Sequence, residues 1–151
     1  MLKITRETEY GLMAMIHIAT RSSGSLGYRR EIADAFQIPN DFLAKVLQKL
    51  SRSELIRSQL GVSGGYCLSR QAAKISFGEI VEAIEGPQKV VECVDGSRDC
   101  VQLSVCPIER TMRQLQKRFR TQLQEISLAE MCRTAGPAEN PTLPAMSARS
   151  G

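Results

Sequence analysis

The chain lacks the features that mark enzymes, membrane proteins and secreted proteins. His17 is the only histidine, and no nucleotide-binding glycine loop or catalytic dyad accompanies the cysteines. General acid–base and nucleophilic catalysis normally require such partners, so an enzyme or an electron carrier is disfavoured. The longest N-terminal apolar run, 11–19, is shorter than the roughly 20 residues of a membrane span, and no secretory signal is visible. We expect a cytoplasmic, non-enzymatic protein without a membrane segment.

Length, composition and charge favour a small globular protein with an anionic partner. The 151 residues suit one domain, or a small domain with a helical extension, and 42% apolar with 24% charged residues is a globular composition. Residues 1–70 carry ten Lys/Arg against six Asp/Glu, whereas residues 71–151 carry ten of each. The basic half indicates nucleic acid first, although a solvated basic face would look the same.

Three of the five cysteines cluster within fourteen residues, as Cys93, Cys100 and Cys106 in VECVDGSRDCVQLSVCPIER. Converging thiolates are soft ligands suited to an iron–sulfur cluster, zinc or copper(I). Their spacing fits neither the paired knuckles of zinc ribbons nor the ferredoxin runs. In a reducing cytoplasm such clusters bind metal more often than they form disulfides. The alternative is three unrelated thiols, or one disulfide and a spare thiol.

The first seventy residues predict a helix-turn-helix. Thr5 caps a helix to about Thr20, in which lone His17 is more typical of a core residue than of a ligand. Two short helices follow, Arg29–Phe36 and Asn40–Ser51, joined by a turn at Pro39, with Asn40 as N-cap. The second has an apolar side of Leu43, Val46, Leu47 and Leu50, opposite a basic and amide side of Lys45, Gln48, Lys49 and Arg52. That pattern suits a recognition helix in a major groove, or else an ordinary amphipathic helix.

A glycine-rich hairpin directly after these helices predicts a wing. The strands Leu55–Leu60 and Tyr66–Ser69 flank the turn 61–65. Beside a recognition helix, Arg57 and the backbone amides of the turn could meet phosphates. We therefore add Arg57, Ser63 and Gly64 of the hairpin, and Arg29 at the start of the first short helix, to the predicted DNA-binding residues.

The second half predicts helices around the cysteines. Ser76 and Glu79 form a capping box for a helix that ends at Gly86, and a long helix runs from Pro107 to about Gln124. Its apolar stripe suits a partner helix, or packing within the chain, and comprises Ile108, Met112, Leu115, Phe119, Leu123 and Ile126. A capping box at Ser127 starts a last short helix.

The predicted fold is mainly α with a small β-hairpin. We divide it into a winged helix-turn-helix DNA-binding domain, 1–86, and a cysteine segment, 87–106. A dimerisation helix with a C-terminal helix, 107–133, and a disordered tail, 134–151, complete the chain.

In this arrangement the sequence resembles the bacterial winged-helix iron–sulfur regulators that include IscR and NsrR. The resemblance covers about residues 1–133 and is carried by LKITRETEYGLMAM, SGGYCLS, ISFGEIVEAIEG, the three cysteines and ISLAEM. It implies a homodimer on a near-palindromic operator, with a two-iron or four-iron cluster on Cys93, Cys100 and Cys106. The family's arginine before the wing glycine is replaced here by Leu60.

The resemblance also suggests a fourth cluster ligand. Relatives use a histidine three residues after the last cysteine, where this chain has Glu109, or an acidic residue of the partner's first helix, which Glu9 matches. We favour Glu9 over Glu109, because a cross-subunit ligand would couple the cluster to the position of the partner's DNA-binding domain. The expected function is a homodimeric transcriptional regulator sensing redox, nitric oxide or iron–sulfur status. The alternative is a DNA-binding regulator whose cysteines hold zinc or act as redox-sensing thiols.

Overall fold

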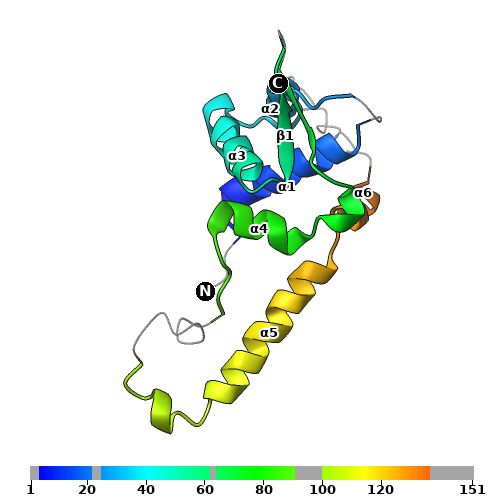
Figure 1. The fold of residues 1–151 in the computed structure, drawn as a ribbon. Coiled ribbons are helices and arrows are strands. Elements are labelled where there is room, and N and C mark those ends of the chain that lie inside the picture. The colour runs from blue at the N-terminus through cyan, green and yellow to red at the C-terminus, as the bar shows by residue number, and fades with distance from the viewer. Residues whose placement is uncertain (1–3, 22–24, 62–63, 91–99, 137–151) are drawn as a thin grey trace, which may run out of the picture.

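A computed structural model describes residues 4–21, 25–61, 64–90 and 100–136. The elements, in chain order, are α1 (Arg6–Ala19), α2 (Arg29–Phe36), α3 (Asn40–Arg52), β1 (Ile56–Gln59), β2 (Gly65–Leu68), η1 (Ala72–Lys74), α4 (Phe77–Glu85), η3 (Leu103–Val105), α5 (Glu109–Glu125) and α6 (Leu128–Thr134). The prediction of a mainly helical chain with one small hairpin is confirmed. Helices α1 to α4, the hairpin and α6 form a head, and α5 projects from it (Figure 1).

Side-chain capping marks the start of three of the six α-helices among the described residues, α1, α4 and α6. The Thr5 hydroxyl accepts a hydrogen bond from the Thr8 amide at the start of α1, as predicted. Ser76 and Glu79 form the predicted reciprocal capping box of α4, with the Ser76 amide donating to the Glu79 carboxylate at 2.8 Å. The prediction for Asn40 is wrong, because Asn40 is the first helical residue of α3 and Pro39 occupies the cap position without a side-chain hydrogen bond.

The turn between α2 and α3 is tight because Gln37 adopts a left-handed conformation. Its φ is 54° and ψ 41°, and it ends α2 with its backbone amide donating to the Ala33 carbonyl. A left-handed residue reverses the chain directly after a helix, which spares a longer connection. Pro39 then begins the next element. The sequence thus places α3 across α2 within three residues, 37–39.

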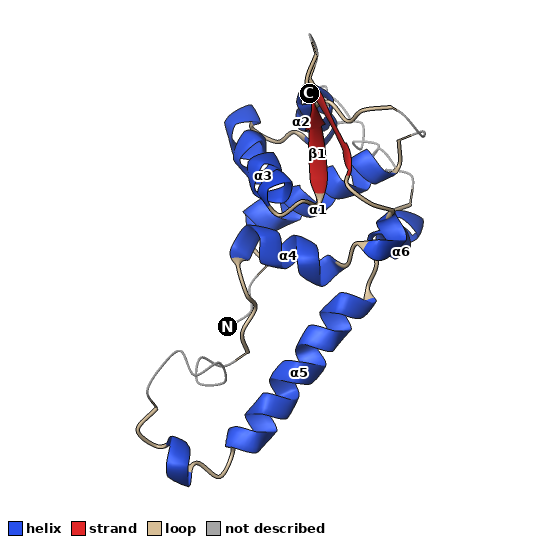
Figure 2. Cartoon of the chain, viewed as in Figure 1, coloured by secondary structure: helices blue, strands red, loops and turns tan. Residues whose placement is uncertain are grey.

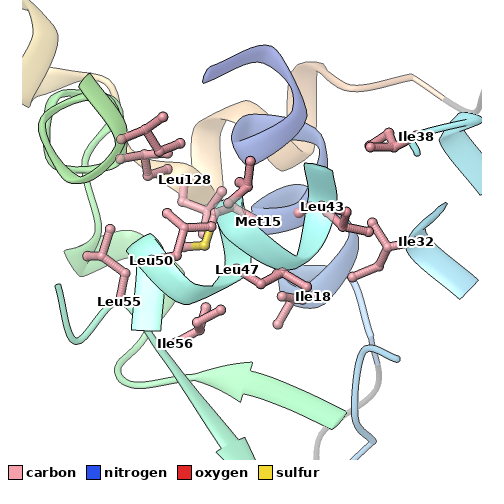
Figure 3. Packing of buried hydrophobic residues seen from close by; sticks show 14 of the residues in the cluster. Met15, Ile18, Ile32, Ile38, Leu43, Leu47, Leu50, Leu55, Ile56 and Leu128 are labelled. Atoms are coloured by element: carbon pink, nitrogen blue, oxygen red, sulfur yellow. The ribbon is translucent and has the colours of Figure 1, made fainter. Parts of the chain in front are cut away.

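One apolar core holds the head together (Figure 3). All four apolar residues predicted for the back of α3, Leu43, Val46, Leu47 and Leu50, are 0% exposed. They pack with α1, α2, the first strand, α4 and α6, through residues that include Met15, Ile32, Ile56, Ile80 and Leu128. Burying a side chain of this size stabilises the fold by about 1.5–3 kcal/mol. The orientation of α3 is therefore set by its own back face.

Helix α5 is attached to the head through α4. The Glu82 carboxylate lies 3.2 Å from the Arg120 guanidinium, and the Phe77 amide donates to the Ile126 carbonyl at 2.8 Å. Gly78 allows this approach, since an added Cβ would lie 3.3 Å from the Leu123 backbone. Helix α5 is therefore fixed to the head near its C-terminal end, and its other end extends outward (Figure 2).

The predicted apolar stripe of α5 is partly covered by the chain itself and partly exposed. Met112, Phe119 and Leu123 are half-buried in the monomer, together with Gln116. Large apolar side chains remain exposed at Ile108, Leu115 and Ile126, with exposed fractions of 55%, 45% and 38%. Part of the stripe thus packs within the chain, as the alternative interpretation held. The remainder is open to a partner.

Helices α1, α3 and α4 come together at Gly11. A Cβ at this position would lie 2.1 Å from Ile84 Cδ1 and 3.3 Å from Val46 Cγ1. Both neighbours are buried, Ile84 at 6% and Val46 at 0% exposed, so neither can swing into solvent. The absence of a side chain at position 11 therefore sets how closely α1 approaches the other two helices.

We expect Gly11→Val to lower the free energy of unfolding by about 1–3 kcal/mol, because a branched side chain overpacks this crossing. Chemical denaturation monitored by circular dichroism measures the change. Met13→Val is the matched control, since Met13 is 36% exposed on the same helix. The control should change stability by no more than about 0.5 kcal/mol. Equal stability of the two variants would contradict the crossing argument.

Candidate nucleic-acid interface and cysteine segment

An open groove runs between α3 and the hairpin. It is lined by Ala44, Lys45, Leu47, Gln48, Ser51, Arg52, Ser58 and Tyr66. Three predicted DNA-binding residues, Lys45, Gln48 and Arg52, therefore share one surface, and all three are exposed. The burial of the apolar back of α3 turns this face outward. Lys45 and Arg52 carry flexible cations and Gln48 an amide, the groups that contact phosphates and base edges.

Lys49 takes a different direction from these three residues. Its ammonium donates to the Glu7 carboxylate at 2.9 Å and to the Ile84 carbonyl at 3.1 Å. Glu7 lies in the first turn of α1, and Ile84 lies near the end of α4. Helical spacing alone predicted that Lys49 lies on the same side of α3 as Lys45. Its ammonium instead turns toward two hydrogen-bond acceptors on neighbouring helices. The structure therefore does not bring Lys49 into the groove with the other predicted contacts.

The hairpin flanks the groove with a short antiparallel ladder. Ile56 pairs with Leu68, Arg57 with Cys67, Ser58 with Tyr66 and Gln59 with Gly65. An isolated bridge between Gly27 and Tyr66 ties the second strand to the segment before α2. Leu60, which stands where relatives have arginine, is fully exposed near the tip. Ser63 lies outside the described residues, so its predicted contact is not placed.

A second hollow lies between the start of α2 and the hairpin. Its lining includes Arg29, Arg30, Asn40, Gly64 and Tyr66. The predicted residues Arg29 and Gly64 are thus brought to one surface. Sequence reasoning missed Arg30, although an adjacent arginine at the same helix start was a usable signal. Tyr66 borders both hollows, and its position was not predictable without the strand register.

The electrostatics of this surface favour an anion. Arg29, Arg30, Lys45, Arg52 and Arg57 are exposed, and none of them forms an ion pair within the part of the chain that the structure describes. By contrast, Arg21, Lys49 and Arg70 of the head are paired with carboxylates. Lys45 and Arg52 line the groove, and Arg29 and Arg30 line the second hollow together with Glu31 and Asp34. Arg57 lines a further hollow of the hairpin with Glu54 and Arg70. A polyanion would find open positive charges there.

The part of the cysteine segment around η3 lies apart from this surface, at the outer end of α5 (Figure 1). Cys100 and Cys106 stand on either side of η3 as free, half-exposed thiols, and Cys93 lies outside the described residues. Val101 and Val105 beside them are 96% and 77% exposed. Free thiols with this access suit the soft metals named above. Among the described residues, no group of three His, Cys, Asp or Glu side chains is arranged to hold a metal ion.

The two candidate carboxylates occupy different parts of the molecule. Glu9 lies in the first turn of α1 and pairs with Arg6 at 2.8 Å. Glu109 begins α5, three residues after Cys106, and pairs with Arg113. His17 is remote from both roles, because its ring packs edge-on against Phe36 with centroids 5.9 Å apart. Burial and the nearby Arg21 guanidinium lower the pKa of His17.

A helix-turn-helix with an unpaired basic face beside a β-hairpin defines a winged-helix DNA-binding protein. No helix among the described residues is long and apolar enough to cross a membrane. The chain belongs to the Rrf2 family, described as iron-dependent transcriptional regulators, whose family pattern matches residues 4–134. It is therefore a transcriptional regulator and not an enzyme.

Individual relatives support this assignment. The chain is 26% identical over 131 residues to the HTH-type transcriptional regulator NsrR of Bacillus licheniformis, covering 86% of this chain and 92% of that protein. The IscR structure from T. potens matches with a TM-score of 0.66 and 25% identity, over 91% of each chain. CymR of B. subtilis, called a global cysteine regulator, matches in fold with a TM-score of 0.70 at 23% identity, covering 89% and 98%.

We expect Lys45→Ala and Arg57→Ala to weaken DNA binding and to reduce the slope of log K against log salt by about 0.9 for each phosphate that is no longer neutralised. Gln48→Ala should instead relax sequence preference, since an amide can bond adenine through two hydrogen bonds. Fluorescence anisotropy at several salt concentrations measures all three. The probe is a duplex enriched from a random pool by the wild-type protein.

The matched control for these variants is Lys117→Ala, which removes a cation from α5 and away from the groove. It should leave the affinity and the salt slope unchanged. Wild-type slopes in both Lys45→Ala and Arg57→Ala would show that this surface does not contact DNA.

Proposed function

We propose that the protein is a homodimeric, cytoplasmic transcriptional regulator that senses redox, nitric oxide or iron–sulfur status through a bound two-iron or four-iron cluster. The observation that carries the DNA-binding part is the row of unpaired cations beside the amide of Gln48 on α3 and the hairpin. The sensing part is supported by the three clustered cysteines, two of which are free and half-exposed.

Recognition of DNA follows from the way the head presents α3. The buried back of this helix leaves Lys45, Gln48 and Arg52 directed away from the core. In a major groove, Gln48 would read a base edge while the two cations bind phosphates. Arg57 on the hairpin and Arg29 at α2 would extend phosphate contacts to either side. A near-palindromic operator then requires a second head at a fixed spacing.

The thiolates of Cys93, Cys100 and Cys106 would hold the cluster, with a carboxylate as fourth ligand. Bound there, the group would supply iron and sulfide that react with nitric oxide or oxidants. A carboxylate is a hard ligand beside three soft ones, and is the bond most easily broken. Glu9 lies in the head, whereas Cys100 and Cys106 lie at the outer end of α5. Glu9 would therefore come from the partner subunit.

A second candidate function keeps the DNA-binding head and replaces the cluster with zinc or redox-sensing thiols. Cys100 and Cys106 are free thiols with solvent access, which such a sensor needs. CymR of Staphylococcus aureus, whose structure is known in an oxidized form, matches this chain with a TM-score of 0.66 and 26% identity. Anaerobic purification separates the two. Visible absorption bands with iron and acid-labile sulfide support a cluster, and a colourless protein supports zinc or bare thiols.

We expect Glu9→Ala to lower cluster content, to change the visible spectrum and to alter the reaction with nitric oxide in anaerobic preparations. Removing a ligand leaves one iron site open to solvent or thiol, and outer ligands are reflected in the spectrum. Glu109→Ala is the paired control, because its carboxylate is the competing candidate. A perturbed spectrum in Glu109→Ala with an unchanged Glu9→Ala would move the ligand to α5.

The exposed apolar residues of α5 would form the dimer contact. We expect Leu115→Glu to give monomers and to abolish tight operator binding, because a charge at this 45% exposed position would be desolvated against the partner. Leu115 is preferable to Phe119 for this test, since Phe119 is half-buried in the monomer. Sedimentation velocity measures the state, with Gln114→Glu on the same helix as control. An intact Leu115→Glu dimer would place the interface elsewhere.

A further inference from the structure

The ammonium of Lys49 joins the recognition helix to two other helices. It donates to the Glu7 carboxylate of α1 at 2.9 Å and to the Ile84 carbonyl of α4 at 3.1 Å. The side chains of Lys49 and Glu7 retain exposed fractions of only 38% and 27%. A half-buried cation that satisfies two acceptors on separate elements fixes their relative positions, because moving any one of them breaks a charged hydrogen bond.

The carboxylate of Glu85 extends this junction. It accepts hydrogen bonds from the hydroxyls of Thr5 and Thr8 at the start of α1, and Thr8 is 0% exposed. Burial would raise the pKa of the Glu85 carboxyl, but these hydroxyls and the charge of Lys49 lower it. Glu85 is therefore an anion beside the Lys49 cation. The end of α4 is thus held to α1 and α3 by polar contacts at two successive residues, Ile84 and Glu85.

The same end of α4 precedes the cysteine segment in the sequence. Gly86, with φ of 83°, ends the helix. Gln116 of α5 then binds the backbone that follows, donating to the Gln88 carbonyl at 2.8 Å and accepting from the Val90 amide at 2.7 Å. We define residues 84–90 as the connector. Its first end is tied to the recognition helix and its second end to α5.

We propose that Lys49 is a positioning residue that holds the recognition helix against the connector, and that it does not contact DNA phosphate. The proposal rests on the DNA-binding function proposed above. It assigns to Lys49 a role that its basic neighbours on α3 do not share, since Lys45 and Arg52 line the groove and have no such partners in the described part of the chain. A displacement of the connector would reach α3 through this residue.

Salt dependence separates the two roles of a lysine. Removing a lysine that contacts a phosphate lowers the slope of log K against log salt by about 0.9. Removing a lysine that pairs only within the protein leaves the slope unchanged, because the number of released counterions stays the same. We expect Lys49→Met to weaken binding to the enriched duplex by about 3- to 30-fold, the range for a charged hydrogen bond and ion pair of this exposure. Its slope should equal that of the wild type. Lys45→Met, the matched control on the same helix, should have a smaller slope.

A charge exchange provides a second test that does not depend on slopes. Lys49→Glu should weaken binding further. Adding Glu7→Lys should restore part of the lost affinity by rebuilding the pair in reverse, whereas the hydrogen bond to the Ile84 carbonyl, which a carboxylate cannot donate, stays lost. The control double variant combines Lys49→Glu with Glu130→Lys, which has the same net charge but no pair at position 49. Glu130 is exposed on α6. Recovery with Glu7→Lys alone supports positioning, and equal recovery in both doubles overturns it.

Each outcome decides the proposal. A reduction of the slope by about one in Lys49→Met, or wild-type affinity in that variant, overturns it. Circular dichroism and melting temperatures verify folding. If Lys49→Glu fails to fold, the salt slope of Lys49→Met decides alone, and Lys49→Arg is the conservative control, because its guanidinium keeps the charge and can donate to the Glu7 carboxylate and the Ile84 carbonyl. Lys49→Arg should bind within about threefold of wild type. Failure of the DNA-binding function itself is distinct, because the wild type would then enrich no duplex.

Discussion

The burial of the back of α3 is the constraint on which the rest of the head depends. Four side chains of this helix are withdrawn completely from solvent, and they belong to the cluster of buried residues that joins α3 to α1, α2, β1 and α4. Rotating α3 by one residue would expose apolar surface worth several kcal/mol, at about 25 cal/mol per Å². That cost fixes which side chains face outward. The DNA-binding surface is therefore a consequence of the core.

Periodicity was sufficient to predict this part of the molecule. Apolar residues at helical spacing located α3 and its outward face, and the glycine-rich turn between alternating strands located the hairpin. Periodicity failed where a neighbouring helix supplied a specific partner. Lys49 shares the basic side of α3 by sequence, but Glu7 and the Ile84 carbonyl draw its ammonium inward. The sequence predicts on which side of its helix a side chain lies. It does not predict which hydrogen-bond acceptors a neighbouring helix offers to that side chain.

The same limit explains the division of α5. Its alternating apolar residues predicted a partner helix, yet the structure places Met112, Phe119 and Leu123 partly against the chain itself. Gly78 was the missing signal, because a glycine in α4 allows the backbone of α5 to approach. For the cysteines, clustering in the sequence indicated binding of a soft metal, but it did not predict how the thiols are arranged in space. Cys93 lies outside the described residues, so the ligand set remains a prediction tested by Glu9→Ala and Glu109→Ala.

Helix α5 contacts the head and the connector on one side and is open to solvent on another. One face holds α4 through Glu82 and Arg120 and binds the connector through Gln116. The other presents Leu115 to solvent, where a partner subunit would pack. In a dimer formed through α5, this helix would set the spacing of the two heads. The same helix binds the connector, the backbone that precedes the cysteines. A displacement at the cysteine end of α5 would then reach the heads through the contacts of Gln116 and Arg120.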